Sequence, residues 1–371
     1  MGTGQEMSTD ISIKYRPRTI EGIVQPAIQR ALINAVESGR LIQFYLFSGP
    51  RGTGKTSTAR WLAATMACQN REGHNPCGKC EVCDSVFSGT LCDVIEINAA
   101  QYTGKDVMEE RVLATINHPP MMGKTKVYIL DECHKLSDSA QNSLLKCLEE
   151  PPSYAMFLFC TTEPQRVLDT IMDRSIHFEF RPIPEATVFE HLGTVCRSEG
   201  IEIDPQALAI IAQEARGSMR RGMKLLQKIG SVNISREDAE TITGKSGATA
   251  AIKYLSLVTQ GKFKDALMFV EELRVHGKDL EGLFREVMEA LADVIRLKVQ
   301  SPGIEARPYS DAERKLLIEV GGQVDGARIR SMISAFERAI MTFQRSGVPA
   351  TLVATAATMD ASAKPEAQKR D

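Results

Sequence analysis

The sequence has no apolar run approaching the ~18 residues that a membrane-spanning helix needs, so we expect no membrane contact. It shows no secretory signal-peptide pattern at its N-terminus. Basic residues are not in excess either: the formal net charge is −2, which excludes a protein that binds polyanions through bulk charge alone. Any contact with nucleic acid must therefore come from a local patch or be shared with partner subunits.

Internal repeats and low-complexity blocks are also absent. The 371 residues suggest two or three domains of ~100–200 residues each, and a hydrophobic content of 43% is enough for packed cores. Nine cysteines without a secretion signal indicate a reducing compartment, where thiols or metal sites are expected instead of disulfides. We therefore expect a cytoplasmic protein.

One segment matches the phosphate-binding pattern G-x-x-x-x-G-K-[ST]. It reads Gly49-Pro50-Arg51-Gly52-Thr53-Gly54-Lys55-Thr56, followed by Ser57. A strand-like stretch precedes it and a helical pattern follows it, which disfavours an ordinary glycine-rich turn. The glycines let the backbone wrap round a phosphate, Lys55 would reach the β- and γ-phosphates, and Thr56 would ligate Mg²⁺. The loop predicts binding of a nucleoside triphosphate.

A second carboxylate site lies at residues 126–132, an apolar stretch that ends in two acids. Asp131 would hold the Mg²⁺ shell, and Glu132 would orient or activate the attacking water. In open α/β sheets ligands bind at the C-terminal ends of strands, which favours this interpretation over a solvated strand end. For the neighbouring His134, a hydrogen-bonded structural role is favoured over a catalytic one.

Four of the nine cysteines are arranged with the spacing C-x8-C-x2-C-x2-C. They are Cys68, Cys77, Cys80 and Cys83, and they lie among turn-forming residues that would let them converge. The spacing favours a tetrahedral thiolate Zn²⁺ site, with free thiols or a redox pair as alternatives. Because four thiolates leave no open position for a substrate, the zinc would be structural.

Strand-like stretches alternate with helical patterns over the first ~180 residues. The strands are expected at 44–47, 94–97, 126–132, 156–160 and 176–180, with a helix at 106–116 and another at 138–149 that Pro151 and Pro152 terminate. This alternation predicts a parallel, five-stranded α/β sheet covered on both faces. From Pro184 onward the pattern changes to helices. Short ones are expected at 186–199, 205–215, 219–229 and 236–243, and longer amphipathic ones at about 248–260, 262–276, 279–300, 310–320 and 324–345.

Several motifs together resemble the ATPase subunit (tau/gamma type) of the bacterial DNA polymerase III clamp loader, an AAA+ family. They are Lys14-Tyr15-Arg16-Pro17, the phosphate-binding loop, the four cysteines, Ile95–Ala100, Asp131–Ser137, Leu144–Pro152, Thr161–Gln165 and Gly217–Arg220. The resemblance covers roughly residues 11 to 245 in order, and the zinc insertion separates this family from other AAA+ proteins.

The resemblance implies a division into domains. Residues 11–183 would form the P-loop ATPase domain with a zinc module at 68–83, residues 184–245 a helical lid, and residues 246–360 an α-helical collar through which subunits oligomerise. We expect a disordered leader at 1–10, a linker at 244–247 and a disordered tail at 361–371. Ending after the collar, the chain looks like a short form of the family.

The resemblance also assigns roles to single residues. Thr162 falls at the position called sensor 1, beside the γ-phosphate, and Arg220 falls at sensor 2, which reports on the phosphates from the lid. Arg174 falls at the arginine finger, which acts on the neighbouring subunit's ATP. Tyr15, Arg16 and Pro17 match the segment near the adenine. The finger motif reads Asp173-Arg174-Ser175 here, so Asp173 is available as a local partner for the arginine.

The implied activity is an ATPase that opens a ring-shaped sliding clamp and places it on primer–template DNA. The implied partners are the other clamp-loader subunits, in a hetero-oligomer expected to be a pentamer, together with the clamp and the DNA. In relatives the segment after the 106–116 helix meets the ring; here it offers Ile116, Met121 and Met122, with burial under the sheet as the alternative. Two other functions stay open, a non-hydrolysing scaffold subunit of the same complex and another AAA+ remodeller such as a helicase loader.

Overall fold

A computed structural model describes residues 10–71, 73–230, 232–243, 248–277, 279–299, 309, 311–345 and 350–362. Contacts group the chain into two units, one of Met1–Val195 with Ala215–Gln227 and one of Cys196–Glu214 with Lys228–Asp371. The helices expected to form a separate lid are thus divided between the units, and the three-domain division stays a prediction. Within the described ranges, no helix is long and apolar enough to cross a membrane.

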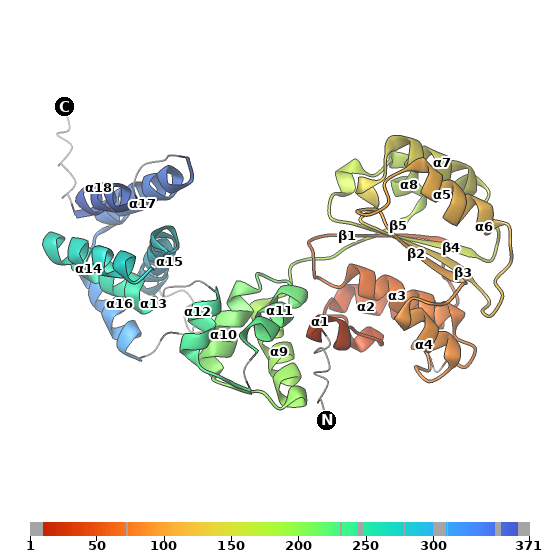
Figure 1. Ribbon diagram of the computed structural model, residues 1–371, viewed down its shortest axis with the longest axis horizontal. Helices are drawn as coiled ribbons and strands as arrows, with labels where there is room; N and C mark the ends of the chain where they lie inside the picture. The colour runs from red at the N-terminus through yellow and green to blue at the C-terminus, as the bar shows by residue number, and fades with distance from the viewer. Residues whose placement is uncertain are drawn as a thin grey trace, which may run out of the picture. The chain divides into compact units, whose positions relative to one another are not determined.

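The expected sheet of five parallel strands is confirmed in the first unit, with the order β2-β3-β4-β1-β5 (Figure 1). Its strands are β1 (Phe44–Ser48), β2 (Val94–Asn98), β3 (Lys126–Asp131), β4 (Ala155–Thr161) and β5 (Ile176–Glu179). Because all five strands run in one direction, their C-terminal ends meet at a single edge of the sheet.

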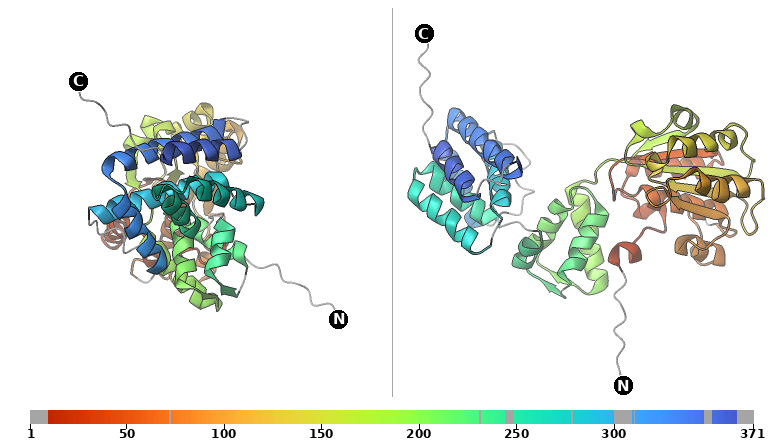
Figure 2. Two further views of the ribbon diagram at one scale, coloured as in Figure 1. Left: turned by 90° about the vertical axis from the view of Figure 1, so that its left-hand side faces the viewer. Right: turned by 45° about the horizontal axis from the view of Figure 1, so that its top comes forward.

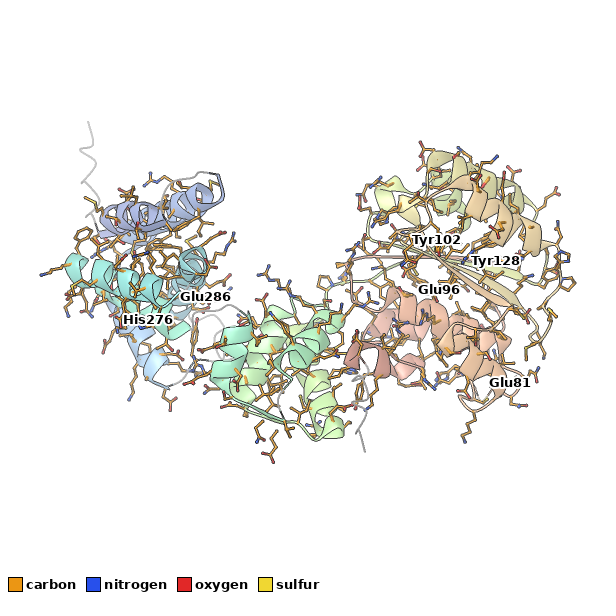
Figure 3. The ribbon with its side chains drawn as sticks, in the orientation of Figure 1. Glu81, Glu96, Tyr102, Tyr128, His276 and Glu286 are labelled. Carbon is orange, nitrogen blue, oxygen red and sulfur yellow. The ribbon has the colours of Figure 1, made fainter. Side chains whose placement is uncertain are left out.

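Helices cover both faces of this sheet (Figure 1). Those on one face are α2 (Pro26–Glu37), α3 (Lys55–Ala67) and α4 (Glu81–Ser88), and those on the other are α5 (Lys105–Met108), α6 (Ala114–Ile116), α7 (Asp138–Glu149) and α8 (Asp169–Arg174). Alternate strand residues divide between two cores: Val127 and Ile129 pack with α2 and α3, whereas Tyr128 and Leu130 pack with α7. Figure 3 labels Tyr128 on the sheet.

The segment predicted as one helix at 106–116 contains a wider turn. A π-helical turn, η2 (Glu109–Leu113), separates α5 from α6. Met108, Val112 and Ile116 are nevertheless all buried, because their spacing of four residues keeps them on one face. The helix at 138–149 begins and ends as expected, and the Ser137 side chain caps its N-terminus by accepting from the Ala140 N–H.

Short elements complete the first unit. They are α1 (Ile11–Lys14), the 3₁₀ turns η1 (Ile20–Gly22), η3 (Cys133–Lys135) and η4 (Pro164–Arg166), and the first residues of α9 (Glu185–Glu199), with most of α11 (Met219–Ile229). Helix α11 belongs to this unit because Gly222 packs against Leu192 of α9 and the Ile11 N–H donates to Gln227.

The second unit is mainly helical (Figure 2). Its elements are α10 (Pro205–Glu214), α12 (Arg236–Thr243), α13 (Ala248–Thr259), α14 (Phe263–Val275), α15 (Leu280–Lys298), α16 (Asp311–Gln323), α17 (Gly326–Arg345), α18 (Ala350–Ser362) and the two-residue strands β6 (Glu202–Ile203) and β7 (Asn233–Ile234). Tyr254, Phe284 and Phe336 form the aromatic centre of its apolar core. Sequence patterning missed α18, which extends into the segment expected to be disordered. Residues 1–9, 244–247 and 363–371 lie outside the described residues.

One buried carboxylate holds the loop that leads into β3. Asp93 accepts hydrogen bonds from the backbone N–H groups of Met121 (2.7 Å), Met122 (2.7 Å) and Gly123 (2.9 Å). Burial by itself would raise the pKa of Asp93, but the three N–H donors more than offset it and lower that pKa below its usual value. The charged form of Asp93 is therefore bonded to the loop in the folded state.

We expect Asp93→Asn to lower the free energy of unfolding by about 1–3 kcal/mol, because the amide sets an N–H donor against backbone donors. The folded pKa lies below the unfolded value of about 3.9, so this stabilisation is present above that pH and is lost as pH falls through the folded pKa. Urea denaturation at a series of pH values should show the wild-type advantage shrinking in acid. Asp84→Asn, at an exposed aspartate, is the matched control, and an equal effect of both substitutions would contradict the role of Asp93.

Candidate functional site

A pocket lies in the first unit, at the edge where the strands end. The residues that line it come from α1 and η1, the phosphate-binding loop, the end of β3, and helices α9 and α11: Ser12, Tyr15, Arg16, Pro17, Gly22, Ile23, Val24, Arg51, Gly52, Thr53, Gly54, Lys55, Thr56, Ser57, Asp131, Glu132, Ile183, His191, Met219, Arg220 and Met223.

The loop after β1 takes a shape that two of its glycines make possible. Gly49 and Gly52 have φ values of 131° and 79°, which L side chains rarely adopt. A Cβ at Gly49 would lie 2.1 Å from the Phe180 carbonyl oxygen, and one at Gly52 would lie 2.0 Å from the Ser218 Oγ. The loop therefore curls tightly and opens at the N-terminus of α3, where free N–H groups can receive a phosphate.

Lys55 is buried at this helix N-terminus. Its Nζ donates to the carbonyl oxygens of Gly49 and Pro50, each at 2.7 Å. Burial lowers the pKa of Lys55, since the surrounding groups solvate an ammonium less well than water does. A phosphate would supply the missing negative charge, so the donor chemistry of the loop fits a nucleotide.

Thr56 and Asp131 are brought together as the sequence predicted. The Thr56 Oγ1 donates to the Asp131 Oδ2 at 2.9 Å. Burial raises the pKa of Asp131, despite the hydrogen bond from Thr56. A hydroxyl and a carboxylate are the hard oxygen ligands that Mg²⁺ prefers, so this pair fits the predicted metal position.

Glu132 is held by two side chains. Its Oε1 accepts from the Arg51 Nε and its Oε2 accepts from the Thr162 Oγ1, each at 3.1 Å. The backbone of Glu132 is left-handed (φ 53°, ψ 41°), a conformation that costs a non-glycine residue about 1–2 kcal/mol. Glu132 and Thr162 are thus neighbours, as expected for a shared role, but both carboxylate oxygens are engaged.

The predicted Tyr15, Arg16 and Pro17 also line the pocket. Arg220 lines the same pocket, and its helix is tied to the loop by a 3.0 Å hydrogen bond from the Met219 N–H to the Gly52 carbonyl. Burial and the nearby positive charges of Arg60 and Arg220 lower the pKa of Arg16. Four cationic side chains and two carboxylates line the pocket, and this excess of positive charge suits a polyphosphate.

Sequence reasoning missed several apolar or aromatic residues that line this pocket: Ile23, Ile183, His191, Met219 and Met223. Met219 and Met223 are four residues apart on α11 and so face the same side. That spacing was a usable signal, but nothing in the pattern said that this face would turn toward the loop.

Arg174 lies at the opposite edge of the sheet from the loop. Its Nη1 donates to the Leu148 carbonyl oxygen at 3.1 Å, at the C-terminal end of α7, and β5 begins two residues later. The C-terminal end of α7 and the start of β5 both lie at the edge of the sheet where the strands begin. The phosphate-binding loop lies at the other edge, because it follows the end of β1. Among the described residues no ion pair joins Arg174 to Asp173, and the guanidinium is exposed.

His134 has the structural surroundings that the sequence favoured. Its Nδ1 lies 3.0 Å from the Thr161 Oγ1, whereas its buried Nε2, 3.3 Å from a Glu163 carboxylate oxygen, makes no hydrogen bond within the part of the chain that the structure describes. Burial lowers the pKa of His134. The imidazole links the end of β4 to η3, and it does not line the pocket.

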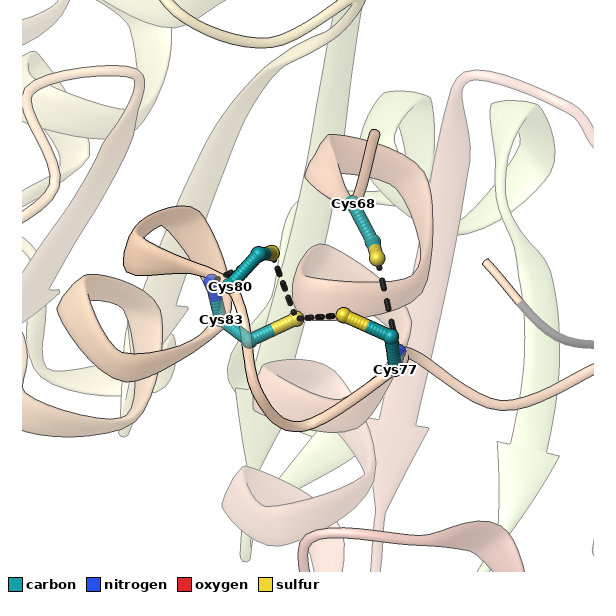
Figure 4. A group of neighbouring side chains, drawn as sticks. All are labelled: Cys68, Cys77, Cys80 and Cys83. Carbon is teal, nitrogen blue, oxygen red and sulfur yellow. Dashed lines mark hydrogen bonds between the residues drawn. The ribbon is translucent and has the colours of Figure 1, made fainter. Parts of the chain in front are cut away.

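The four cysteines converge beside the C-terminal end of α3 (Figure 4). Their sulfur atoms all lie within 4.8 Å of one another, and the Cys80 and Cys83 sulfurs are 3.4 Å apart. Tetrahedral Zn–S bonds of about 2.3 Å would set the sulfurs about 3.8 Å apart, so the cluster fits zinc with small adjustments.

The protonation of the cluster depends on where each thiol lies. Hydrogen bonds from backbone N–H groups lower the pKa of Cys77 to about 6, and the bond from the Lys79 N–H has the largest effect. Burial raises the pKa of Cys83, so that thiol would lose its proton only to a bound cation. The zinc assignment stays a prediction that the donor set supports.

Two family profiles match the chain. One described as "DNA polymerase III, delta subunit" matches residues 24–184, and one described as "DNA polymerase III clamp loader subunit, ATPase lid domain" matches residues 187–229. These two stretches contain the loop, the carboxylates, the cysteines and Arg220.

Full-length relatives extend the match. DNA polymerase III subunit tau of Bacillus subtilis is 33% identical over 328 residues, which cover 87% of this chain and 58% of that protein. DNA polymerase III subunit gamma of Buchnera aphidicola is 33% identical over 283 residues, covering 75% of this chain and 78% of that protein. The chain spans 42–58%, about half, of the length of five relatives of the tau or gamma/tau type, the Bacillus subtilis protein among them.

Among solved structures, the chain is similar to the Thermotoga maritima RuvB Holliday junction branch migration motor. The TM-score is 0.45 and the identity 15%, covering 66% of this chain and 79% of the other. This likeness is weak, and the fold assignment rests on the sheet order and the phosphate-binding loop.

We expect purified protein to carry about one zinc per chain, bound by the four cysteines. Cys77→Ser should lose the metal, whereas Cys92→Ser, at an exposed cysteine outside the cluster, should keep it. Structural zinc contributes an apparent ~10–16 kcal/mol in small peptides, but here the large sheet should preserve the fold without it. Metal analysis and native-state alkylation provide the measurement; absence of zinc with all four thiols freely alkylated would refute the site.

Proposed function

The chain belongs to the tau/gamma family of DNA polymerase III clamp-loader subunits, and from this premise we propose that it is an ATP-hydrolysing motor subunit that opens a sliding clamp and loads it on primer–template DNA. The observation that carries the proposal is the intact set of Lys55, Thr56, Asp131 and Glu132 at one pocket. A scaffold subunit that binds without turnover would not need this set. Its partners would be the other clamp-loader subunits, the clamp and the primed DNA.

The residues of the pocket would divide the chemistry among them. The α3 N-terminus and Lys55 would bind the β- and γ-phosphates, while Thr56 and Asp131 would hold Mg²⁺, which neutralises charge developing on the transferred phosphoryl group. Glu132 would orient water, and Thr162 and Arg220 would contact the γ-phosphate region. Tyr15, Arg16 and Pro17 would lie toward the base.

Lys55 and Glu132 must both rearrange before hydrolysis. The Lys55 amine would exchange the carbonyls of Gly49 and Pro50 for phosphate oxygens, and Glu132 would leave Arg51 and Thr162 to receive a proton from water. The same phosphate that attracts Lys55 would attract Arg51, because both cations belong to one loop. Nucleotide binding would in this way release the carboxylate that hydrolysis needs.

Arg174 would act on the ATP of a neighbouring subunit. Its place at the edge where the strands begin keeps it from its own phosphates, and its exposed guanidinium is available to another chain. Such a finger stabilises charge in the loose transition state of phosphoryl transfer and contributes about 10³–10⁵ in rate.

Isolated chains should therefore bind ATP but hydrolyse it slowly, with turnover rising on assembly with partners, clamp and primed DNA. Arg174→Ala should abolish that stimulation and leave ATP affinity intact, while Lys55→Ala should lose ATP binding. Arg166→Ala, at another exposed arginine of the same unit, is the matched control and should behave like wild type. ATP binding and steady-state ATPase rates of the reconstituted complex provide the measurements; an isolated monomer that already turns over at the assembled rate would contradict action in trans.

Mixed complexes sharpen the same test. At an interface between the two variants, the Arg174→Ala subunit supplies an intact ATP pocket and the Lys55→Ala subunit supplies an intact arginine finger. This interface should therefore recover ATP turnover. A mixed complex as inactive as either parent, with assembly verified, would count against the proposal.

Two methionines give the proposed motor a surface for the clamp. Met121 is 84% exposed and Met122 39%, so the alternative of burial under the sheet applies to Ile116 alone. Asp93 fixes their backbone, and the Gln69 Nε2 donates to the Met122 carbonyl at 2.8 Å. Apolar side chains on a rigid, exposed loop are suited to an interface.

We expect Met121→Asp with Met122→Asp to weaken clamp binding by at least about tenfold, because charge would replace apolar contact area. Met268→Asp, at an exposed methionine of α14, is the matched control and should bind the clamp normally. Binding of immobilised clamp in the presence of ATP provides the measurement. Unchanged clamp affinity with an intact fold would refute this surface.

A further inference from the structure

The helix that begins at the phosphate-binding loop ends at the cysteine cluster. Helix α3 starts with Lys55 and Thr56, and its C-cap is Cys68. Trp61 lies in the middle of this helix and is fully buried. The two sites therefore share one rigid element, and the loop between Cys68 and Cys77 returns alongside it.

Asn75 in that returning loop joins three parts of the chain. Its Oδ1 accepts from the Trp61 indole Nε1 (2.9 Å) and from the Ile20 backbone N–H (3.0 Å). Its Nδ2 donates to both carboxylate oxygens of Glu21, at 2.9 and 3.0 Å. Two donors meet the oxygen and an acceptor meets the nitrogen, so the amide has one consistent orientation.

His74 strengthens the same connection. Its two ring nitrogens each lie 2.9 Å from a carboxylate, one from Glu21 and the other from Glu37 at the end of α2. Burial would raise the pKa of Glu21, but its bonds from His74, its own backbone N–H and Asn75 lower that pKa to about 2. Glu21 is therefore ionised at neutral pH and paired with the cysteine loop.

The segment that Asn75 holds forms a wall of the pocket. Ile20 and Glu21 begin the turn η1, and the next three residues, Gly22, Ile23 and Val24, line the pocket. Ile23 also lies beside the phosphate-binding loop, since a Cβ at Gly54 would be 3.7 Å from its Cγ2. Pro76 follows Asn75 and is buried, and Cys77 comes next. Cys77, a member of the cysteine cluster, thus lies two residues from the amide that bonds the turn at Ile20 and Glu21.

We propose that Asn75 is a positioning residue through which the metal-bound cysteine loop holds the Gly22–Val24 wall in place, so that loss of the metal weakens nucleotide binding. The inference rests on the proposed function, in which this pocket binds ATP. The cysteine cluster then has a purpose beyond fold stability: it sets the shape of the nucleotide pocket through Asn75.

Trp61 reports on this contact directly, because it is the only tryptophan of the chain. Asn75→Ala removes the acceptor of its indole N–H and should shift its emission in the absence of nucleotide. The same variant should bind MgATP about 3- to 10-fold more weakly than wild type. Asn34→Ala, at an exposed asparagine of α2 for which no side-chain hydrogen bond is found among the described residues, should change neither.

Chelation separates the metal from the side chain. Removing zinc from the zinc-loaded wild type should reproduce the emission shift and the weaker MgATP binding. In Asn75→Ala, chelation should add little to the loss, because the connection is already cut. Equal effects of chelation in both proteins, or none on wild-type emission and affinity, would overturn the proposal.

A paired substitution distinguishes positioning from structural damage. Asn75→Asp keeps an acceptor for Trp61 but faces Glu21 with a like charge, so MgATP should bind weakly. Adding Glu21→Gln restores a donor opposite the new carboxylate and should recover affinity; failure to recover, with normal thermal unfolding, would count against the proposal. If wild type itself bound no MgATP, the proposed function would fail. The response of Trp61 emission to chelation would still decide whether the metal acts on Asn75.

Discussion

The nucleotide site depends on the parallel direction of the five strands. Residues far apart in the sequence meet because each follows the end of a strand: Lys55 follows β1, Asp131 ends β3 and Thr162 follows β4. Strands β1 and β4 are neighbours in the sheet, and β3 is next to β4. The same constraint separates Arg174 from this group, since it precedes a strand and so lies at the other edge.

Burial shifts the pKa values of two charged residues in the pocket, Lys55 and Asp131, in opposite directions. Burial lowers the pKa of Lys55 and raises that of Asp131, because it disfavours the charged form of each. Both shifts would be relieved by the opposite charges of phosphate and Mg²⁺. Glu132 differs, since Arg51 and Thr162 already satisfy it. Within the described part of the chain, the two buried charges thus lack ion-pair partners of opposite charge that a nucleotide and a cation would supply, whereas Glu132 already has its hydrogen bonds.

The cysteine cluster and the pocket are parts of one structural arrangement. Helix α3 joins the phosphate-binding loop to Cys68, and Asn75 joins the cysteine loop to the turn at residues 20–22. Two segments that line the pocket are therefore connected to the same module. The hydrogen bonds of the module reach Glu37 of α2, Trp61 of α3, the turn at 20–22 and, through Gln69, the loop that leads into β3.

Local pattern alone determined the parallel α/β class, the five strands, the phosphate-binding loop, the paired acids and the four cysteines, because each depends on spacing along the chain. Local pattern did not predict the π turn at Glu109–Leu113, around which Met108, Val112 and Ile116 are buried. It also did not predict helix α18, which buries Val353 and Ala357. The pairing of Glu132 with Arg51, the approach of Met219 and Met223 to the loop, and the bonds of Asn75 join segments that are distant in sequence. Only the tertiary structure decided these, because no local periodicity records which distant donor will meet a given acceptor.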